Sequence, residues 1–225
     1  MVKKVVSGIM RFQQSAFETR KALFAELASA QSPEVLFLTC ADSRIDPNLV
    51  TQAEPGDLFI CRIAGNIVPP HLRMAGGVTA SIEYAVAVLG VKDIIVCGHT
   101  DCGAMKGALN QDALKNLPHV RDWLEHCRAA VDVVHAHDWP DAAAQLKALT
   151  EQNVLLQLQH LRTHPSVAVG LSLGKLALHG WIYNIEAGEV TCYDDDEAAF
   201  VPLSERYANL LSSPGTHGGM RRQPV

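Results

Sequence analysis

Short apolar runs alternate with longer stretches of helical periodicity along most of the chain. The runs typical of buried strands cover residues 35–39, 57–62 and 93–98. Apolar residues at helical spacing predict helices over 8–29, 77–89, 103–110, 117–137 and 141–163. Two later strands are expected at 176–183 and 189–193, on either side of the turn Ala187-Gly188. This alternation predicts an α/β fold with a central, mainly parallel sheet flanked by helices.

Residues 165–173 fit two structures. Their β-branched side chains are typical of a strand, whereas Pro165 in a first-turn position and Gly174 as a stop favour a short helix. We take the helix as the prediction.

The length of the chain predicts a single domain. A chain of 225 residues can bury about 70% of the surface that it exposes when unfolded. Hydrophobic residues make up 48% and charged residues 19%, which excludes the disordered and low-complexity classes. We assign residues 1–211 to one domain whose residues 1–30 form a helical arm. The segment 212–225 is expected to be a flexible tail.

The net charge and the apolar pattern indicate which partners and which cellular compartment to expect. The net charge of −5 gives no reason to expect nucleic-acid binding. No stretch approaches the roughly 18 apolar residues of a transmembrane helix, and Arg11 ends the first apolar run too early for a signal peptide. We therefore expect a cytoplasmic protein without membrane contact, in which thiols stay reduced. Its six cysteines need an explanation other than three disulfides, and buried packing is the simplest one.

Three potential metal ligands follow two of the predicted strands. Cys40 follows the first strand, His99 follows the third, and Cys102 comes three positions later. Because ligands bind at the carboxyl ends of parallel strands, the two loops are expected to converge. Two cysteines and one histidine form a recognised catalytic zinc set. The spacing alone is a weak signal for such a site.

The evidence for a metal site is stronger because of the segment Cys40-Ala41-Asp42-Ser43-Arg44. An Asp–Arg pair at the surface contributes little to stability, so the pair by itself is uninformative. Next to a metal ligand, however, Arg44 would keep Asp42 ionised. Asp42 would then be ready to accept a hydrogen bond from a hydroxide on the metal.

These segments resemble the β-class carbonic anhydrases. The resemblance rests on Cys-Ala-Asp-Ser-Arg at 40–44 and Gly-His-Thr-Asp-Cys-Gly-Ala-Met at 98–105, and it extends in order from about Lys3 to Leu203. It is strongest to bacterial members associated with cyanate degradation. The one departure in the first motif is Ala41, where the family usually has serine.

The family has two types, and four positions bear on the choice. Gln31 matches the glutamine of the plant-like type, nine positions before the first zinc cysteine. The allosteric type has a tryptophan that, with an arginine and a tyrosine, binds bicarbonate away from the metal. Arg62 and Tyr183 match the last two, but Phe37 lacks the indole N–H donor. The resemblance therefore implies the plant-like type, with an open zinc position.

The resemblance also implies a reaction, which is the reversible hydration of CO2 to bicarbonate and a proton by a hydroxide on one zinc ion per chain. Asp42 and Arg44 would be catalytic, and Gln31 and the Gly103 backbone N–H would donate to the substrate. Two thiolate ligands are expected to shift the activity toward alkaline pH.

The substrate pocket implied by the resemblance is apolar. Phe59, Ala64 and Tyr84 would line it, partly across a dimer interface, and Ala64 is smaller than the usual family residue. The family forms homodimers or larger homo-oligomers, tetramers and octamers among them, through N-terminal helices that embrace a partner. The apolar face of residues 8–29 fits this role and fits packing on its own subunit equally well.

Two other functions keep the same ligands. One is hydrolysis of carbonyl sulfide or carbon disulfide, which the metal motif does not exclude. The other is a non-catalytic zinc domain in which Asp42 is a permanent fourth ligand. The intact pair of Asp42 and Arg44, together with Gln31, argues against the second.

Overall fold

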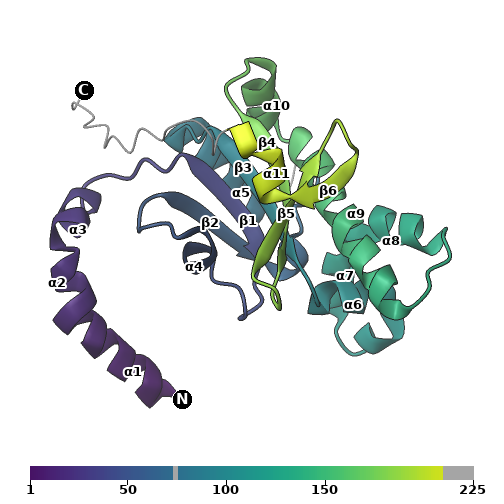
Figure 1. Ribbon diagram of the computed structural model, residues 1–225, viewed down its shortest axis with the longest axis horizontal. Helices are drawn as coiled ribbons and strands as arrows, with labels where there is room; N and C mark the ends of the chain where they lie inside the picture. The colour runs from purple at the N-terminus through teal and green to yellow at the C-terminus, as the bar shows by residue number, and fades with distance from the viewer. Residues whose placement is uncertain (73–75, 210–225) are drawn as a thin grey trace.

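A six-stranded sheet forms the centre of the protein. The computed structural model describes residues 1–72 and 76–209, so the predicted tail at 212–225 lies outside the described residues. The strands lie in the order β2-β1-β3-β4-β5-β6 (Figure 1). Their bounds are β1 (Val35–Cys40), β2 (Leu58–Ile63), β3 (Asp93–His99), β4 (Ala177–Asn184), β5 (Glu189–Asp194) and β6 (Ala199–Pro202).

The first four strands run parallel, and the last two are added antiparallel. The predicted mainly parallel sheet and the strand expected at 189–193 are therefore confirmed. β1 and β3 are almost continuously buried, since helices and loops cover both faces at the centre of the sheet. Their carboxyl ends lie side by side, which brings Cys40 and His99 to the same edge.

Helices and short helical turns connect the strands. Their bounds are η2 (Ala64–Asn66), α4 (Pro47–Thr51), α5 (Gly77–Glu83), η3 (Tyr84–Leu89), α6 (Gly103–Leu109), η4 (Gln111–Leu114), α7 (Pro118–Leu124), η5 (Glu125–Cys127), α8 (Arg128–His135), α9 (Ala142–Arg162), α10 (Pro165–Ser172) and α11 (Leu203–Arg206). The helix predicted at 165–173 is α10, begun by Pro165 in its first turn. The helix predicted over 117–137 is divided into α7, η5 and α8. No helix among the described residues is long and apolar enough to cross a bilayer.

The long helix α9 packs closely on β3 and β4. A Cβ atom at Gly98 would lie 2.9 Å from Val154 Cγ2, and one at Gly180 would lie 2.9 Å from Val154 Cγ1. Glycine at these two strand positions therefore lets the helix approach the sheet backbone. This close packing fixes the carboxyl end of β3, which carries His99.

The N-terminal helix projects away from the sheet as an arm (Figure 1). It consists of α1 (Val2–Arg11), η1 (Phe12–Ala16), α2 (Phe17–Thr19) and α3 (Lys21–Leu27), with a break at Arg20. The apolar periodicity placed the helix start at residue 8, within the predicted arm of residues 1–30, whereas the helix begins at Val2. The reason is that apolar residues continue at helical spacing upstream of residue 8. No side chain from residue 2 to 27, all within the described part, is buried.

The arm contacts the body of the protein at its base. The Arg20 guanidinium pairs with the Glu54 carboxylate at 2.8 Å, and Leu27 lies against Gly56. Farther out, the rings of Phe12, Phe17 and Phe24 pack on one another, with centroids 5.4–6.0 Å apart.

Candidate metal centre

Three side chains converge at the carboxyl edge of the parallel strands. Cys40 ends β1, His99 ends β3, and Cys102 is the N-cap residue of α6. One ligand atom from each lies within 4.8 Å of those of the other two, and all three residues are buried. The structure thus brings the predicted ligands together, as expected for loops that follow neighbouring parallel strands.

The imidazole of His99 is set up as a metal ligand. Its Nδ1 lies 2.8 Å from the Thr100 carbonyl oxygen, which accepts hydrogen bonds only, so Nδ1 carries the proton. A metal is bound by the neutral form of the ring, and in that form the lone pair is on Nε2. This atom is buried and has no hydrogen-bond partner in the described part of the chain. A buried polar atom without a partner is costly, and a metal ion beside it removes that cost.

The thiol of Cys40 lies in surroundings that favour the thiolate. A hydrogen bond from the Cys102 thiol, the neighbouring His99 ring and the Gly65 N–H, 3.3 Å from Sγ, together hold the pKa of Cys40 below its usual value, although burial opposes them. Cys102 lies at the start of α6, where backbone N–H groups point outward. Two thiolates and one imidazole are a zinc ligand set, so these residues fit one zinc ion per chain.

The other four cysteines lack such surroundings. All are free thiols, and burial is the main factor that raises the pKa of each: Cys61, Cys97, Cys127 and Cys192. For Cys97 and Cys127 the pKa rises to about 12. These thiols remain protonated at neutral pH and act as small apolar side chains, as the sequence indicated.

Asp42 and Arg44 form a two-point ion pair beside the ligands. Arg44 Nε lies 2.9 Å from Asp42 Oδ1, and Nη2 lies 2.8 Å from Oδ2. The Arg44 backbone N–H also donates to Oδ1, at 2.9 Å. These hydrogen bonds hold the pKa of Asp42 well below its usual range, so the carboxylate stays ionised. Its Oδ2 lies 3.9 Å from His99 Nε2, which places it next to the metal position without taking a ligand's place.

Two further residues support this pair, and sequence reasoning assigned neither to this role. Arg62 Nη2 donates to the Asp42 backbone oxygen at 2.6 Å, and Nε donates to that of Cys40 at 3.3 Å. Asp101 Oδ2 accepts from Arg44 Nη1 at 2.9 Å, and the Asp101 carbonyl accepts from Nη2 at 3.1 Å. The signal for Asp101 was its place inside the His-Thr-Asp-Cys motif.

The predicted pocket residues are only partly assembled within one chain. The rings of Phe59 and Tyr84 pack with centroids 6.0 Å apart, and Tyr84 is exposed. Ala64 lies in η2, where its carbonyl accepts from Trp123 Nε1 at 3.0 Å. Gly103 directly follows Cys102 as the first residue of α6. Gln31, by contrast, is exposed and makes no hydrogen bond within the described residues.

Comparisons with known proteins identify a family and relatives of this chain. A family model described as carbonic anhydrase matches residues 35–190. A carbonic anhydrase of Pseudomonas aeruginosa is 50% identical over 204 residues, covering 91% of this chain and 93% of that protein. Carbonic anhydrase 1 of Escherichia coli O157:H7 is 47% identical over 203 residues, covering 90% and 93%.

Solved structures agree as well. The β-carbonic anhydrase CcaA is similar with a TM-score of 0.86 at 43% identity, covering 89% of this chain and 98% of its own. A tetrameric β-carbonic anhydrase of Sordaria macrospora is similar with a TM-score of 0.76 at 28% identity, covering 85% and 95%.

Proposed function

The chain belongs to the β-class carbonic anhydrases, and from that premise we propose that Asp42, held by Arg44, orients the nucleophile that attacks CO2. The enzyme catalyses the interconversion of CO2 and bicarbonate, with zinc held by Cys40, His99 and Cys102. The observation that carries the proposal is the two-point pair of Asp42 and Arg44 next to these ligands.

The chemistry divides between the metal and the chain. When bound, zinc acidifies a coordinated water, so that a hydroxide nucleophile is present near neutral pH. Because Arg44 keeps Asp42 ionised, the carboxylate accepts hydrogen bonds and donates none. An O–H group that donates to Asp42 turns its lone pair away from the carboxylate and toward the substrate. Asp42 thereby selects one orientation of the nucleophile.

We propose that five further residues form the binding site for CO2 and bicarbonate. Phe59, Tyr84 and Ala64 offer an apolar wall for neutral CO2, while the Gly103 N–H and the Gln31 amide offer donors to the developing bicarbonate. The exposed Tyr84, and Gln31 without a hydrogen bond to any described residue, support a pocket that a second subunit completes. The exposed apolar arm supports the same homodimer, and larger assemblies are compatible with the tetrameric relative.

We place the chain in the plant-like type, beside the bacterial enzymes associated with cyanate degradation. Phe37 is buried against Trp181, with ring centroids 6.3 Å apart, in the region where the allosteric type binds bicarbonate. Arg62 is occupied by the backbone of the Cys40–Asp42 loop. The pairing of both Asp42 oxygens with Arg44 also argues against a non-catalytic zinc domain closed by Asp42.

Replacing Asp42 by asparagine tests the proposal. Asp42→Asn keeps the shape but removes the charge, so kcat for CO2 hydration should fall by about 10- to 100-fold, the usual effect of losing a group that orients metal chemistry. The zinc content should stay unchanged, because Asp42 is not a ligand. Stopped-flow hydration and metal analysis measure the two quantities. Asp195→Asn, in the exposed turn after β5, is the matched control.

An unchanged rate in Asp42→Asn would refute the role given to Asp42. Loss of zinc together with activity would instead mean that Asp42 coordinates the metal.

A further inference from the structure

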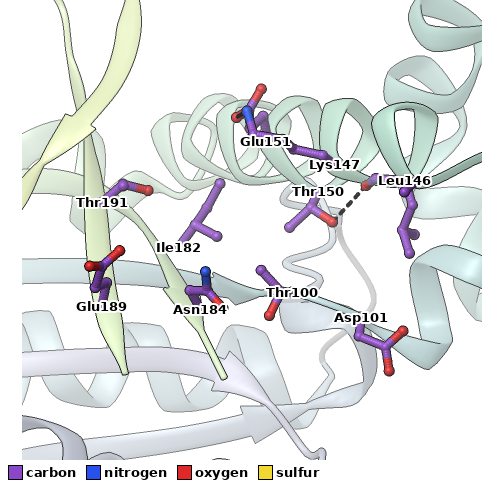
Figure 2. Close-up of a pocket in the computed structure, with 11 residues that line it drawn as sticks. Thr100, Asp101, Leu146, Lys147, Thr150, Glu151, Ile182, Asn184, Glu189 and Thr191 are labelled. Carbon is purple, nitrogen blue, oxygen red and sulfur yellow. Dashed lines mark hydrogen bonds and ion pairs between the residues drawn. The ribbon is translucent and has the colours of Figure 1, made fainter. Parts of the chain in front are cut away.

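A cavity of about 400 Å³ lies on the α9 side of the sheet, outside the metal centre. Figure 2 shows helix α9 above it, the strands β4 and β5 beside it, and the segment after β3 at its far end. None of the three metal ligands lines it. Its volume is in the range of small-molecule sites, which are mostly apolar with a few placed polar groups.

The inner wall of the cavity is apolar. Ile182 and Thr150 are buried there, and Leu146 is partly buried. The Thr150 hydroxyl donates to the Leu146 carbonyl at 2.9 Å, the bond drawn dashed in Figure 2. Its polar atom is thus satisfied within the helix, which leaves its methyl group for the cavity. A hydrocarbon chain is therefore the chemistry that this wall fits.

The charged groups at the rim leave one carboxylate unmatched. Glu151 pairs with Lys147 one turn away on α9, and Asp101 is engaged by Arg44 and Lys106. Glu189 at the start of β5 has no ion pair in the described part of the chain. The unneutralised charge at this cavity is therefore negative.

A second polar group lies next to Glu189 on the same strand face. Thr191 is two residues along β5, so its side chain points to the same side as that of Glu189, and Figure 2 shows both beside the cavity. The Thr191 hydroxyl makes no hydrogen bond with any described residue. A carboxylate and a free hydroxyl together can accept from one ammonium group, which has three donors.

We propose that this cavity is a binding site for a small organic cation, namely a primary ammonium group on a short aliphatic chain. The ammonium group binds Glu189 and Thr191 at the rim, and the chain lies along Ile182 and Leu146. An alcohol of the same length lacks the charge, and a carboxylate of the same length is repelled by Glu189. The site thus selects its ligand by charge at the rim and by chain length at the wall.

Carbon-13 methyl spectra of the zinc-loaded enzyme test this directly, because Ile182 and Leu146 report from the cavity wall and not from the metal. We expect n-pentylammonium to shift both methyl signals saturably. Affinity should rise about fourfold for each methylene from n-propylammonium upward, as buried CH2 groups require. Neither n-pentanol nor n-pentanoate should match it.

Two variants distinguish binding of the ammonium group by Glu189 from a non-specific effect of the protein's net charge. Glu189→Gln should weaken n-pentylammonium binding at least fivefold. Glu197→Gln, which removes an equal charge from the turn after β5 outside the cavity, should leave binding unchanged.

The proposal is overturned if n-pentylammonium leaves the two methyl signals in place, if n-pentanol shifts them with equal affinity, or if both variants weaken binding alike. Each result is independent of the assignment of Asp42, because no step of the test measures CO2 hydration.

Discussion

The Arg44 guanidinium binds two residues, Asp42 and Asp101. Its contacts with Asp101 limit its movement and so hold the Asp42 carboxylate in place. One edge of the guanidinium binds Asp42, while Nη1 and Nη2 also donate to the side chain and carbonyl of Asp101. Asp101 is further paired with Lys106 on α6. Its backbone is left-handed, with φ of 58°, a conformation that only a few non-glycine residue types tolerate. Asp101 therefore acts as a positioning residue for Arg44.

Asp101→Asn isolates the charge of this residue. Asparagine tolerates the left-handed backbone equally well, so the loop should keep its shape. With a weaker hold on Arg44, kcat for CO2 hydration should fall about tenfold, at the lower end of the range for residues that act on a metal site through another residue. KM and zinc content should not change, since Asp101 touches neither substrate nor metal. Stopped-flow kinetics measure both constants.

The control for this variant is Asp112→Asn, an exposed aspartate in η4. If Asp101→Asn raised KM and left kcat alone, Asp101 would act on substrate binding and the positioning role would be wrong.

At the scale of residues, the sequence predicted the side chains whose position follows from strand ends. Cys40 and His99 terminate neighbouring parallel strands, so their convergence needed only the α/β pattern. Asp101 was not predicted, because its contacts depend on the path of a tight turn. The role of Gln31 stays a prediction, since it requires a second subunit.

At the scale of elements, the close contact of α9 with the sheet constrains the loop that follows β3. Val154 on α9 is fully buried and lies over Gly98 on β3 and Gly180 on β4. Any side chain at either glycine would push the helix away from the strands. Since His99 follows Gly98 directly, the position of α9 also determines the position of a metal ligand.

Gly180→Ala tests this packing away from the ligands. The added Cβ would lie 2.9 Å from Val154 and 3.1 Å from Leu158, so the free energy of unfolding should fall by about 1–3 kcal/mol, the usual cost of overpacking. Urea unfolding measures it. Gly77→Ala, where a Cβ meets no atom within 4 Å, should have a small effect. Equal stability of both variants would show that α9 gives way easily.

Some elements were harder to predict than others for identifiable reasons. The strands of the parallel core were predicted within about one residue, because buried runs have sharp polar ends. The second antiparallel strand, β6, was not predicted. It is only four residues long and follows a charged turn, and its structure depends on pairing with β5. The periodic segment 8–29 began later than the helix itself because the helix has no N-terminal cap side chain to mark its start, although the assigned arm of residues 1–30 includes that start.

At the scale of the whole molecule, the packing within a single chain does not account for the exposed apolar side chains of the arm. Val2, Val5 and Ile9 on α1 are each more than half exposed. Exposed apolar side chains at helical spacing are typical of an interaction surface, and we propose that a second subunit covers this one. The sequence left open whether the arm packs on its own subunit, and the structure places α1 away from the sheet (Figure 1).

Ile9→Glu should weaken the proposed dimer, because it places a charge within that apolar surface. We expect the variant to dissociate at a concentration about tenfold or more above that of the wild type, the effect of roughly 1.4 kcal/mol. Sedimentation velocity over a concentration series measures this. Lys3→Gln changes the net charge by the same amount on the same helix and should dissociate as the wild type does. A monomeric wild type would contradict the dimer.

Zinc-dependent CO2 hydration is tested most directly by stopped flow on zinc-loaded protein between pH 7 and 9, with metal analysis of the same samples. We expect about one zinc ion per chain, rapid hydration that increases toward alkaline pH, and loss of both zinc and activity in Cys102→Ala. Fully zinc-loaded protein that does not hydrate CO2 anywhere in that range would contradict this activity.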